Sequence, residues 1–174
     1  PGKFRPLGIP TVKDRVVQAA ILQVLEPVFE AQFLGVSYGF RPKKACRDAL
    51  EHIRNAIRPT GTKTATDWPR PPYQWVIEGD IQECFDTIDH HTVMTRLRRR
   101  VGDRKVCRVV LAFLKVGILD RGAFRRTKTG TPQGGILSPL LANIVLSAIE
   151  ERYGRYVKWS RRKDGKPYVR PGYE

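Results

Sequence analysis

Hydrophobic residues recur along the chain mainly with the period of a helix. Between Thr11 and Glu30 the apolar side chains fall on one helical face, namely Val17, Ile21, Val24, Leu25, Val28 and Phe29. Thr11 followed by Asp14 resembles an N-terminal capping box, which marks the beginning of this helix. The pattern therefore predicts a long amphipathic helix near the N-terminus.

Four more helices are predicted before the basic tail. One covers residues 45–57 with an apolar face turned inward, and two basic amphipathic helices cover 91–100 and 104–114. A further helix begins at Ser138, because serine is a good capping residue and Pro139 suits a first helical turn. From Gly154 onward the chain is basic and aromatic, with no apolar period.

Extended structure is predicted at two places. The run at residues 73–79 is a short apolar segment after a loop at 59–72, and it predicts a buried strand. Residues 116–119 and 123–127 flank the turn sequence Asp-Arg-Gly and predict a hairpin. Strands thus alternate irregularly with helices, so the predicted fold class is α+β rather than a doubly wound parallel sheet.

Length, charge and cysteine content narrow the function. A chain of 174 residues with 41% hydrophobic composition suits one globular domain. Its net charge of +15 attracts polyanions, so nucleic acid is the first partner to consider, ahead of a generally basic surface or an anionic membrane. No apolar run is long enough to span a bilayer and the N-terminal residues show no signal-peptide pattern, so we expect a cytoplasmic protein that makes no membrane contact. Cys46, Cys84 and Cys107 form no Cys-x-x-Cys pair, which fits buried thiols in a reducing compartment.

Acidic residues gather directly after the predicted strand at 73–79. Asp80 stands at the end of that strand, and Glu78, Glu83, Asp86 and Asp89 surround it in sequence. A rigidly held carboxylate in a basic chain fits an enzyme that binds Mg²⁺ together with phosphate oxygens. The structural alternative is that Asp80 caps the helix that follows.

Four segments together resemble one family, the reverse transcriptases encoded by bacterial group II introns. "RPLGIPTVKDRVVQ" (5–18) resembles the family's second conserved block and "SYGFRP" (37–42) the segment after it. "GDIQECFDTIDH" (79–90) resembles the third block and "GTPQGGILSPLLANIVL" (130–146) the fourth. One such motif is a weak signal, whereas four in the family's order are a strong one.

The resemblance implies a role for each matching position. Asp80 matches the first catalytic aspartate, which binds two Mg²⁺ ions, and the backbone carbonyl of Ile81 matches another metal ligand. Phe85 matches the aromatic residue that excludes a 2′-hydroxyl from the nucleotide site. Gln133 and Gly134 match nucleotide-binding residues in a Pro-Gln-Gly turn, and Arg5 matches a residue that contacts the triphosphate. Without the resemblance, Phe85 is interpreted as a residue of the hydrophobic core and Gly134 as part of a tight turn.

Other basic residues are candidates for contact with RNA or DNA. Arg41 matches no catalytic position, and a contact with the template or primer backbone stands beside a structural role at a helix end. The segment 96–105 is the densest basic stretch, and in it Arg98, Arg99 and Lys105 are candidates to bind nucleic-acid phosphates. The alternative for this segment is a solvated helix face.

The resemblance also implies an architecture, the fingers and partial palm of a right-hand polymerase, with an antiparallel palm sheet packed on helices. We expect fingers at 1–58 and 91–137, a loop at 59–73 and the palm start with Asp80 at 74–90. The palm helix then covers 138–160 and a basic tail 161–174, with no thumb or later domain. A palm sheet without its partner strand leaves an open edge, so we expect homodimers or larger aggregates.

The function implied is RNA-directed DNA synthesis by two-metal nucleotidyl transfer, with an RNA template, a DNA primer, dNTPs and intron RNA as partners. The alternative is a maturase module that binds intron RNA without catalysis and so assists splicing. An Asp80→Ala change separates these hypotheses, because RNA binding by such a module would be nearly indifferent to the loss of that carboxylate.

The chain departs from the family in its set of carboxylates. Members supply two more aspartates from a Tyr-Ala-Asp-Asp hairpin after the helix that begins here at Ser138, and no such motif occurs in the sequence. Two metal ions need more than one carboxylate, so we expect this chain alone to be unable to polymerise. Primer extension on an RNA template with Mg²⁺ and dNTPs tests this expectation, and robust extension would contradict it.

Overall fold

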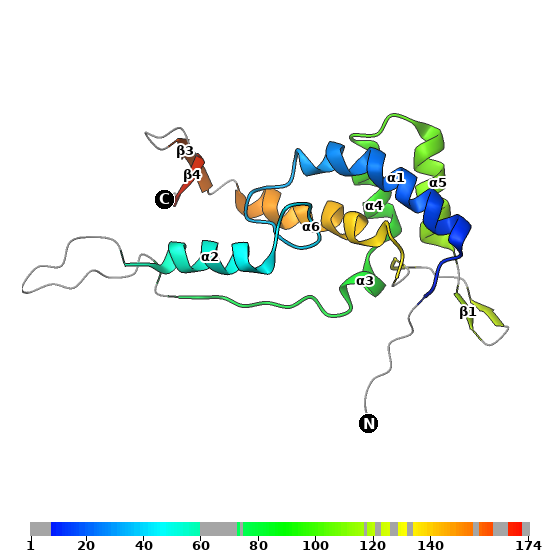
Figure 1. The fold of residues 1–174 in the computed structure, drawn as a ribbon, viewed down its shortest axis with the longest axis horizontal. Coiled ribbons are helices and arrows are strands. Elements are labelled where there is room, and N and C mark those ends of the chain that lie inside the picture. The colour runs from blue at the N-terminus through cyan, green and yellow to red at the C-terminus, as the bar shows by residue number, and fades with distance from the viewer. Residues whose placement is uncertain are drawn as a thin grey trace, which may run out of the picture. The chain divides into compact units, whose positions relative to one another are not determined.

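The helices of the protein belong to two units, shown in Figure 1. Unit 1 comprises residues 1–34 and 83–174, and unit 2 comprises residues 35–82. The computed structural model describes residues 8–59, 73, 75–116, 118–120, 123–125, 129–131, 134–154, 157–161 and 167–171, with side chains for 8–59, 73, 75–116, 129–131 and 134–152. No helix among these residues has the length and apolar character needed to cross a membrane.

Helix α1 (Val12–Glu30) begins at the predicted capping box. The Thr11 hydroxyl accepts a hydrogen bond from the Asp14 backbone N–H at 3.2 Å and donates one to the Asp14 carboxylate at 2.7 Å. These bonds satisfy a backbone donor that the first helical turn leaves unpaired. The prediction for the start of this helix is confirmed.

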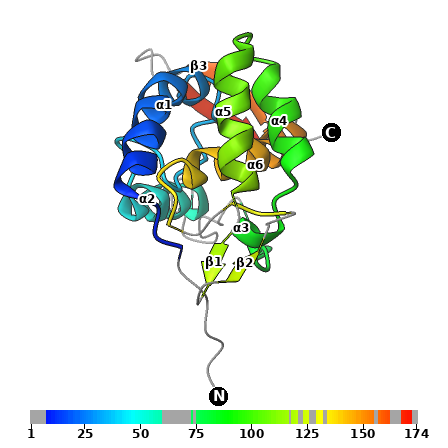
Figure 2. The same cartoon turned by 90° about the vertical axis from the view of Figure 1, so that its right-hand side faces the viewer.

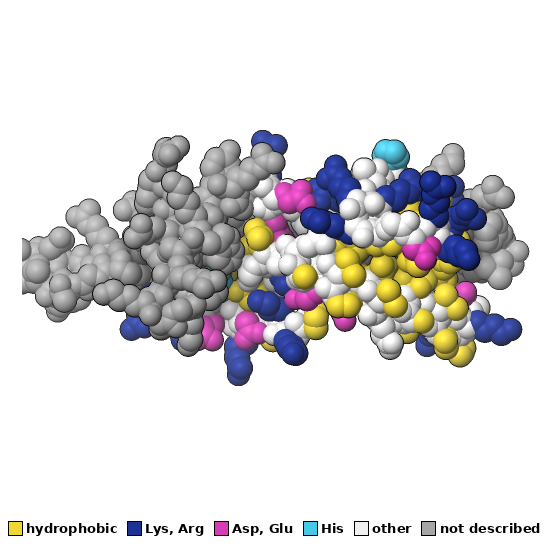
Figure 3. Space-filling view, turned by 90° about the horizontal axis from the view of Figure 1, so that it is seen from above, with side chains coloured by type: hydrophobic (Ala, Val, Ile, Leu, Met, Phe, Trp, Pro, Cys, Tyr) yellow, Lys and Arg dark blue, Asp and Glu magenta, His cyan; other side chains and the backbone are white. Residues whose placement is uncertain are grey.

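The buried face of α1 is only partly the predicted one. Gln18, Leu25 and Phe29 are buried, whereas Val24 is 63% exposed. Val17 and Val28 are exposed as well, so α1 carries a second apolar stripe. Figure 3 shows a yellow band of apolar side chains on the α1 side of unit 1. A helix with two apolar stripes has no periodicity that identifies the buried one, so only packing decides.

Helix α6 (Ser138–Gly154) is the centre of unit 1, since α1, α3 (Cys84–Thr87) and α4 (His90–Arg98) all pack against it. Helix α5 (Arg104–Lys115) packs on α4, and Figure 2 shows these two side by side. The fully buried side chains at this centre are Leu25, Val93, Leu97, Val110, Leu114, Leu137, Leu141 and Ile144. Burial of these apolar groups is the main stabilising contribution to unit 1.

Two aspartates mark the starts of α4 and α5. Asp89 accepts a hydrogen bond from the Thr92 backbone N–H at 2.8 Å, and Asp103 accepts one from the Lys105 N–H at 2.6 Å. Hydrogen bonds from the Thr92 hydroxyl and backbone favour the ionised carboxylate and so lower the pKa of Asp89. Both helices therefore begin within a residue of the positions that the sequence predicts.

Two short hairpins complete unit 1. β1 (Ile118–Asp120) and β2 (Ala123–Arg125) pair antiparallel, at the place where the sequence predicts a hairpin. β3 (Val157–Arg161) and β4 (Pro167–Pro171) also pair antiparallel, where the pattern predicts no regular element. Each hairpin is a separate two-stranded sheet.

The predicted α+β fold with an antiparallel palm sheet is wrong for the described part of the chain. Residues 75–80 form no strand, and Trp75 is 89% and Ile77 98% exposed. A strand needs a neighbour for its backbone N–H and C=O groups, and among the described residues none pairs with this segment. The described architecture is helical, with the two hairpins as its only strands.

Unit 2 contains α2 (Cys46–Ile57), which has no buried residue. The prediction that its apolar face is buried is wrong, since Leu50 is 67% exposed and Ile53 is exposed too. The described residues of unit 2 include no other helix or strand that could cover this face. Cys46, at the start of α2, is exposed as well, whereas Cys107 in α5 is buried.

The packing in unit 1 makes the substitution Leu97→Ala strongly destabilising. Leu97 is 0% exposed, so its truncation leaves a cavity, and we expect a loss of about 2–5 kcal/mol in the free energy of unfolding. Urea denaturation followed by circular dichroism measures this loss. Leu50→Ala is the matched control because Leu50 is exposed, and equal losses for the two variants would contradict the described core.

Candidate functional site

The segment that leads into the Pro-Gln-Gly turn is held by the residues around α3. The Gly130 N–H donates to the Ile88 carbonyl at 2.8 Å, and the Thr131 N–H donates to the Phe85 carbonyl at 2.7 Å. These two bonds join the third and fourth family-like blocks, which are more than 40 residues apart in the sequence. The fold therefore brings together two segments that the sequence could only place in order.

A buried histidine makes a third connection between the same segments. His90 lies at the start of α4, and its Nε2 is 2.6 Å from the Gly130 carbonyl oxygen. Because a carbonyl oxygen only accepts, Nε2 carries the proton and donates it. His90 thus has a positioning role: it fixes the carbonyl of Gly130.

Two glycines in this region adopt backbone angles that favour glycine. Gly130 has φ = 85° and Gly134 has φ = 101°. A Cβ added to Gly130 would stand 2.7 Å from the Asp86 carbonyl oxygen, so a side chain would also collide with α3. The close approach of 129–131 to α3 therefore requires glycine at this position.

The second family-like block meets the fourth through Gln18. Its side-chain oxygen accepts a hydrogen bond from the Leu137 backbone N–H at 3.3 Å, and Gln18 is buried. Leu137 directly precedes α6, so this bond satisfies a donor at the beginning of that helix. Three of the four motif segments are thus connected by hydrogen bonds inside unit 1.

Phe85 lies at the junction of these segments. It belongs to α3, and its partly buried ring packs against the hydrophobic core. Its backbone carbonyl accepts the bond from Thr131, so the position of the ring is tied to the approach of the Pro-Gln-Gly turn. Of the two roles that the sequence left open for Phe85, the core contact is present. Exclusion of a 2′-hydroxyl by this ring stays a prediction.

Asp80 and Ile81 belong to the irregular end of unit 2. Asp80 is exposed, so the predicted rigid position at a strand end is not found, although its carboxylate is open to solvent and ligands. A carboxylate and a main-chain carbonyl are the hard oxygen donors that Mg²⁺ prefers, and the ion commonly takes one or two carboxylates together with substrate phosphates. These donors fit such an ion, but as a partial set. The described residues include no group of three acidic, histidine or cysteine side chains suited to a metal.

The other candidate residues differ in their surroundings. Arg5 and Gln133 lie outside the described residues. Arg41 is buried, and its guanidinium donates to the Ser37 carbonyl at 2.8 Å, a contact that agrees with the structural alternative for this residue. The remaining three basic candidates, Arg98, Arg99 and Lys105, are exposed around the connection between α4 and α5.

Sequence reasoning missed the residues that hold the site together. Gln18 and His90 are polar side chains with backbone partners 40 or more residues away. A polar residue on an apolar helical face, as Gln18 is with Leu22 and Leu25 on the following turns, is the one signal that could have marked it. His90 stands next to His91 in a run of polar residues and carries no such signal.

Comparison with known proteins decides the family. The family described as reverse transcriptase (RNA-dependent DNA polymerase) matches residues 1–163. The chain belongs to the reverse transcriptase family. The resemblance to group II intron proteins is also confirmed, because the group II intron-encoded protein LtrA of Lactococcus lactis subsp. cremoris is 41% identical over 149 residues.

Other relatives agree with this assignment. Protein YkfC of Escherichia coli strain K12 is 40% identical over 94% of this chain, and nuclear intron maturase 1 of Arabidopsis thaliana is 35% identical over 72% of it. The chain spans 41% of YkfC, 23% of LtrA and 16% of the maturase. A solved structure titled as a partial Cas6-RT-Cas1–Cas2 complex matches 94% of this reverse transcriptase chain and 27% of its own, with 27% identity and a TM-score of 0.52.

The close contact at Gly130 generates a test of the site. Gly130→Ala places a methyl group against the Asp86 backbone at an unfavourable φ, so the bonds to Phe85 and Ile88 should be strained or lost. We expect a loss of about 1–3 kcal/mol or more in unfolding free energy.

Gly102→Ala is the matched control, because nothing lies within 4 Å of a Cβ added there. Thermal unfolding of both variants measures the difference. A Gly130→Ala protein as stable as Gly102→Ala would show that segment 129–131 is not held against α3.

Proposed function

We propose that this chain supplies the nucleotide-binding part of a reverse transcriptase that copies RNA into DNA. The observation that carries the proposal is the hydrogen-bonded junction of Gly130 and Thr131 with Ile88 and Phe85, directly before the Pro-Gln-Gly sequence. Family membership gives the class of reaction. The close approach at the junction explains why a glycine with positive φ stands at position 130. The substrates of the reaction are a dNTP, a DNA primer and an RNA template.

Asp80 and the Ile81 carbonyl would hold the divalent ion that the family's chemistry uses. A bound Mg²⁺ supplies positive charge that stabilises the phosphate oxygens during nucleotidyl transfer. Asp80 is suited to this role because it is an exposed carboxylate in a chain whose net charge is +15. Two oxygen donors leave most of an octahedral shell to water, to substrate phosphates and to further carboxylates.

The residues of the junction would bind the incoming nucleotide. Phe85 presents an aromatic ring whose position is restricted by its core contacts and by the hydrogen bond that its backbone carbonyl accepts from the Thr131 N–H. A fixed ring can exclude a 2′-hydroxyl by contact, which favours DNA building blocks over RNA ones. Gly134, with no side chain, lets the backbone approach a nucleotide closely, and Arg5 and Gln133 complete this proposed set.

A second function, the binding of intron RNA in splicing, is favoured by one of the relatives. Nuclear intron maturase 1 carries the maturase function in its name and matches 72% of this chain. Such a function needs a basic surface and not the Asp80 carboxylate. The two functions are compatible in one polypeptide, because they use different residues.

Primer extension by the natural protein that contains these residues tests the catalytic proposal. Asp80→Asn keeps the size of the side chain and removes its charge, so we expect at least about a 100-fold loss in the rate of DNA synthesis on an RNA template. Glu78→Gln is the matched control, because Glu78 is an exposed acid of the same segment and has no proposed metal contact.

The pair of variants also separates the two functions. If RNA binding alone is the function, the wild-type protein will extend no primer and both variants will bind intron RNA equally well. Undiminished extension by Asp80→Asn would refute the assignment of Asp80 as a metal ligand.

A further inference from the structure

The connection between α4 and α5 contains a groove that none of the catalytic residues uses. It has a volume of about 420 Å³, and residues from both helices and from the turn between them line it. The lining residues are Arg98, Val101, Gly102, Arg104, Cys107, Arg108 and Leu111. Three arginines thus surround one hollow, and no carboxylate lines it.

These arginines are available to a ligand. Arg98, Arg104 and Arg108 are exposed, and none of the three guanidinium groups has an ion pair or hydrogen bond among the residues that the structure describes. The one acid between residues 96 and 108, Asp103, uses its carboxylate to cap α5 through the Lys105 and Val106 N–H groups. One carboxylate beside three arginines leaves the groove with a net positive charge among the described residues.

The position of Arg104 has no structural benefit. It is the first residue of α5, where the helix dipole disfavours a cation. The Asp103 carboxylate occupies the N–H groups at this helix end, so the positive potential of the groove comes from its three arginines. The arrangement is unfavourable for the helix alone and favourable for binding phosphate.

The floor of the groove is apolar and rigid. Cys107 is buried in the core, and its thiol donates to the Val101 carbonyl at 3.6 Å. A low-dielectric wall strengthens the attraction between the arginines and an anion. The floor offers neither an exposed aromatic ring for stacking nor a row of polar groups for reading bases.

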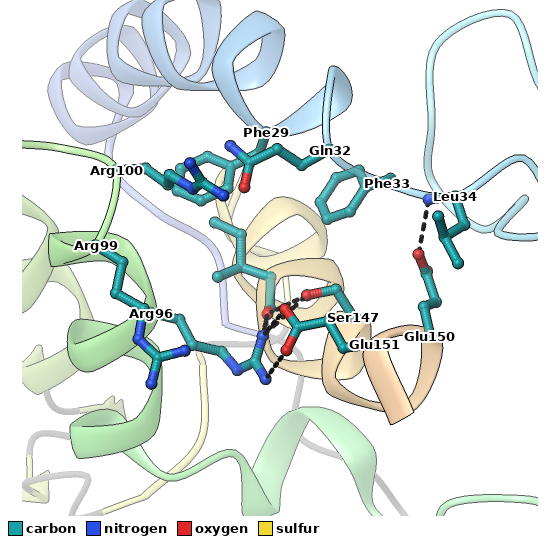
Figure 4. Close-up of a pocket in the computed structure, with 11 residues that line it drawn as sticks. Phe29, Gln32, Phe33, Leu34, Arg96, Arg99, Arg100, Ser147, Glu150 and Glu151 are labelled. Atoms are coloured by element: carbon teal, nitrogen blue, oxygen red, sulfur yellow. Dashed lines mark hydrogen bonds and ion pairs between the residues drawn. The ribbon is translucent and has the colours of Figure 1, made fainter. Parts of the chain in front are cut away.

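A neighbouring hollow in unit 1 shows the contrast. It has a volume of about 350 Å³ and lies where α1, α4 and α6 meet (Figure 4). There Arg96 forms an ion pair with Glu151 at 2.9 Å, and the Glu150 carboxylate accepts a bond from the Leu34 N–H. Its charges are largely used within the fold, although Arg99 and Arg100 also line it.

The basic side chains of both helices extend the charge beyond the groove. Seven basic residues occur between Arg96 and Arg108, and Figure 3 shows Lys and Arg side chains gathered on the α4–α5 side of unit 1, beside the yellow band. A single small anion would need only the groove, whereas an extended series of charges suits a chain of phosphates. The buried apolar face of α5 leaves it little to insert into a membrane.

We infer that the α4–α5 groove binds the phosphate backbone of RNA without reading its sequence, through Arg98, Arg104 and Arg108. The inference rests on the proposed function for the identity of the polyanion, since both candidate functions need RNA. It adds a specific site for that RNA, separate from the nucleotide-binding residues, and it adds Arg104 and Arg108 to the basic candidates.

Salt-dependent binding of RNA tests the inference. Fluorescence anisotropy measures the affinity of the 174-residue chain for a mixed-sequence single-stranded RNA over a series of KCl concentrations, without Mg²⁺ or dNTPs. The variant R98Q/R104Q/R108Q loses three phosphate contacts, so we expect the slope of log affinity against log salt to decrease in magnitude by about two. Scrambling the RNA sequence should change neither slope.

The matched control is R47Q/R54Q/R58Q, which removes the same charge from exposed positions in unit 2. We expect its slope to change by well under one. Equal changes in the two variants would assign the effect to net charge, and an unchanged slope in the groove variant would overturn the site outright. Circular dichroism of both variants confirms that each is folded before binding is compared.

Two further arms identify the ligand and separate the two proposals. Poly-glutamate at matched charge should compete weakly with RNA, and equal competition would reassign the groove to acidic proteins. The Asp80→Asn chain should bind RNA with the wild-type slope. Because the binding assay contains no metal or dNTP, a loss of primer extension in the catalytic experiment does not change the RNA-binding result. If the groove variant binds RNA with the wild-type slope, the catalytic proposal is unaffected.

Discussion

The pair of backbone hydrogen bonds from Gly130 and Thr131 to Ile88 and Phe85 is the contact on which the site depends. It joins two segments that the chain separates by more than 40 residues, and the absence of a side chain at Gly130 permits the approach. His90 reinforces the contact from the side of α4. These groups are buried or nearly so, and an unpaired buried donor or acceptor costs about 1–3 kcal/mol, so the junction is strongly specified.

The junction also explains why the helices of unit 1 pack as they do. Helix α6 begins at Ser138, and Gln18 of α1 accepts the N–H of Leu137 just before it. Thr131 and Leu137, which stand before and after the Pro-Gln-Gly sequence, are therefore held by α3 and by α1 respectively. Apolar packing of α4 and α5 around α6 supplies most of the stabilising free energy, whereas the polar contacts choose one arrangement among many.

The cations of the described residues differ in their surroundings. Arg96 and Arg41 are used within the fold, one in an ion pair with Glu151 and one in a bond to Ser37. The arginines of the α4–α5 groove have no such partner among the described residues, and Arg104 opposes the dipole of its own helix. A chain with a net charge of +15 thus contains cations of two kinds, and only their surroundings separate them.

The sequence by itself determined the family, the starts of α1, α4, α5 and α6 and the position of the β1–β2 hairpin, because these depend on local spacing, capping and turn residues. It failed where a partner was needed. The apolar run at Trp75–Ile77 predicted a palm strand but is exposed, and α2 has an apolar face that nothing described covers. Only the tertiary structure decided which stripe of α1 is buried, that His90 binds Gly130 and that three arginines line one groove. These features depend on which helix faces meet, and local spacing in the sequence does not determine that.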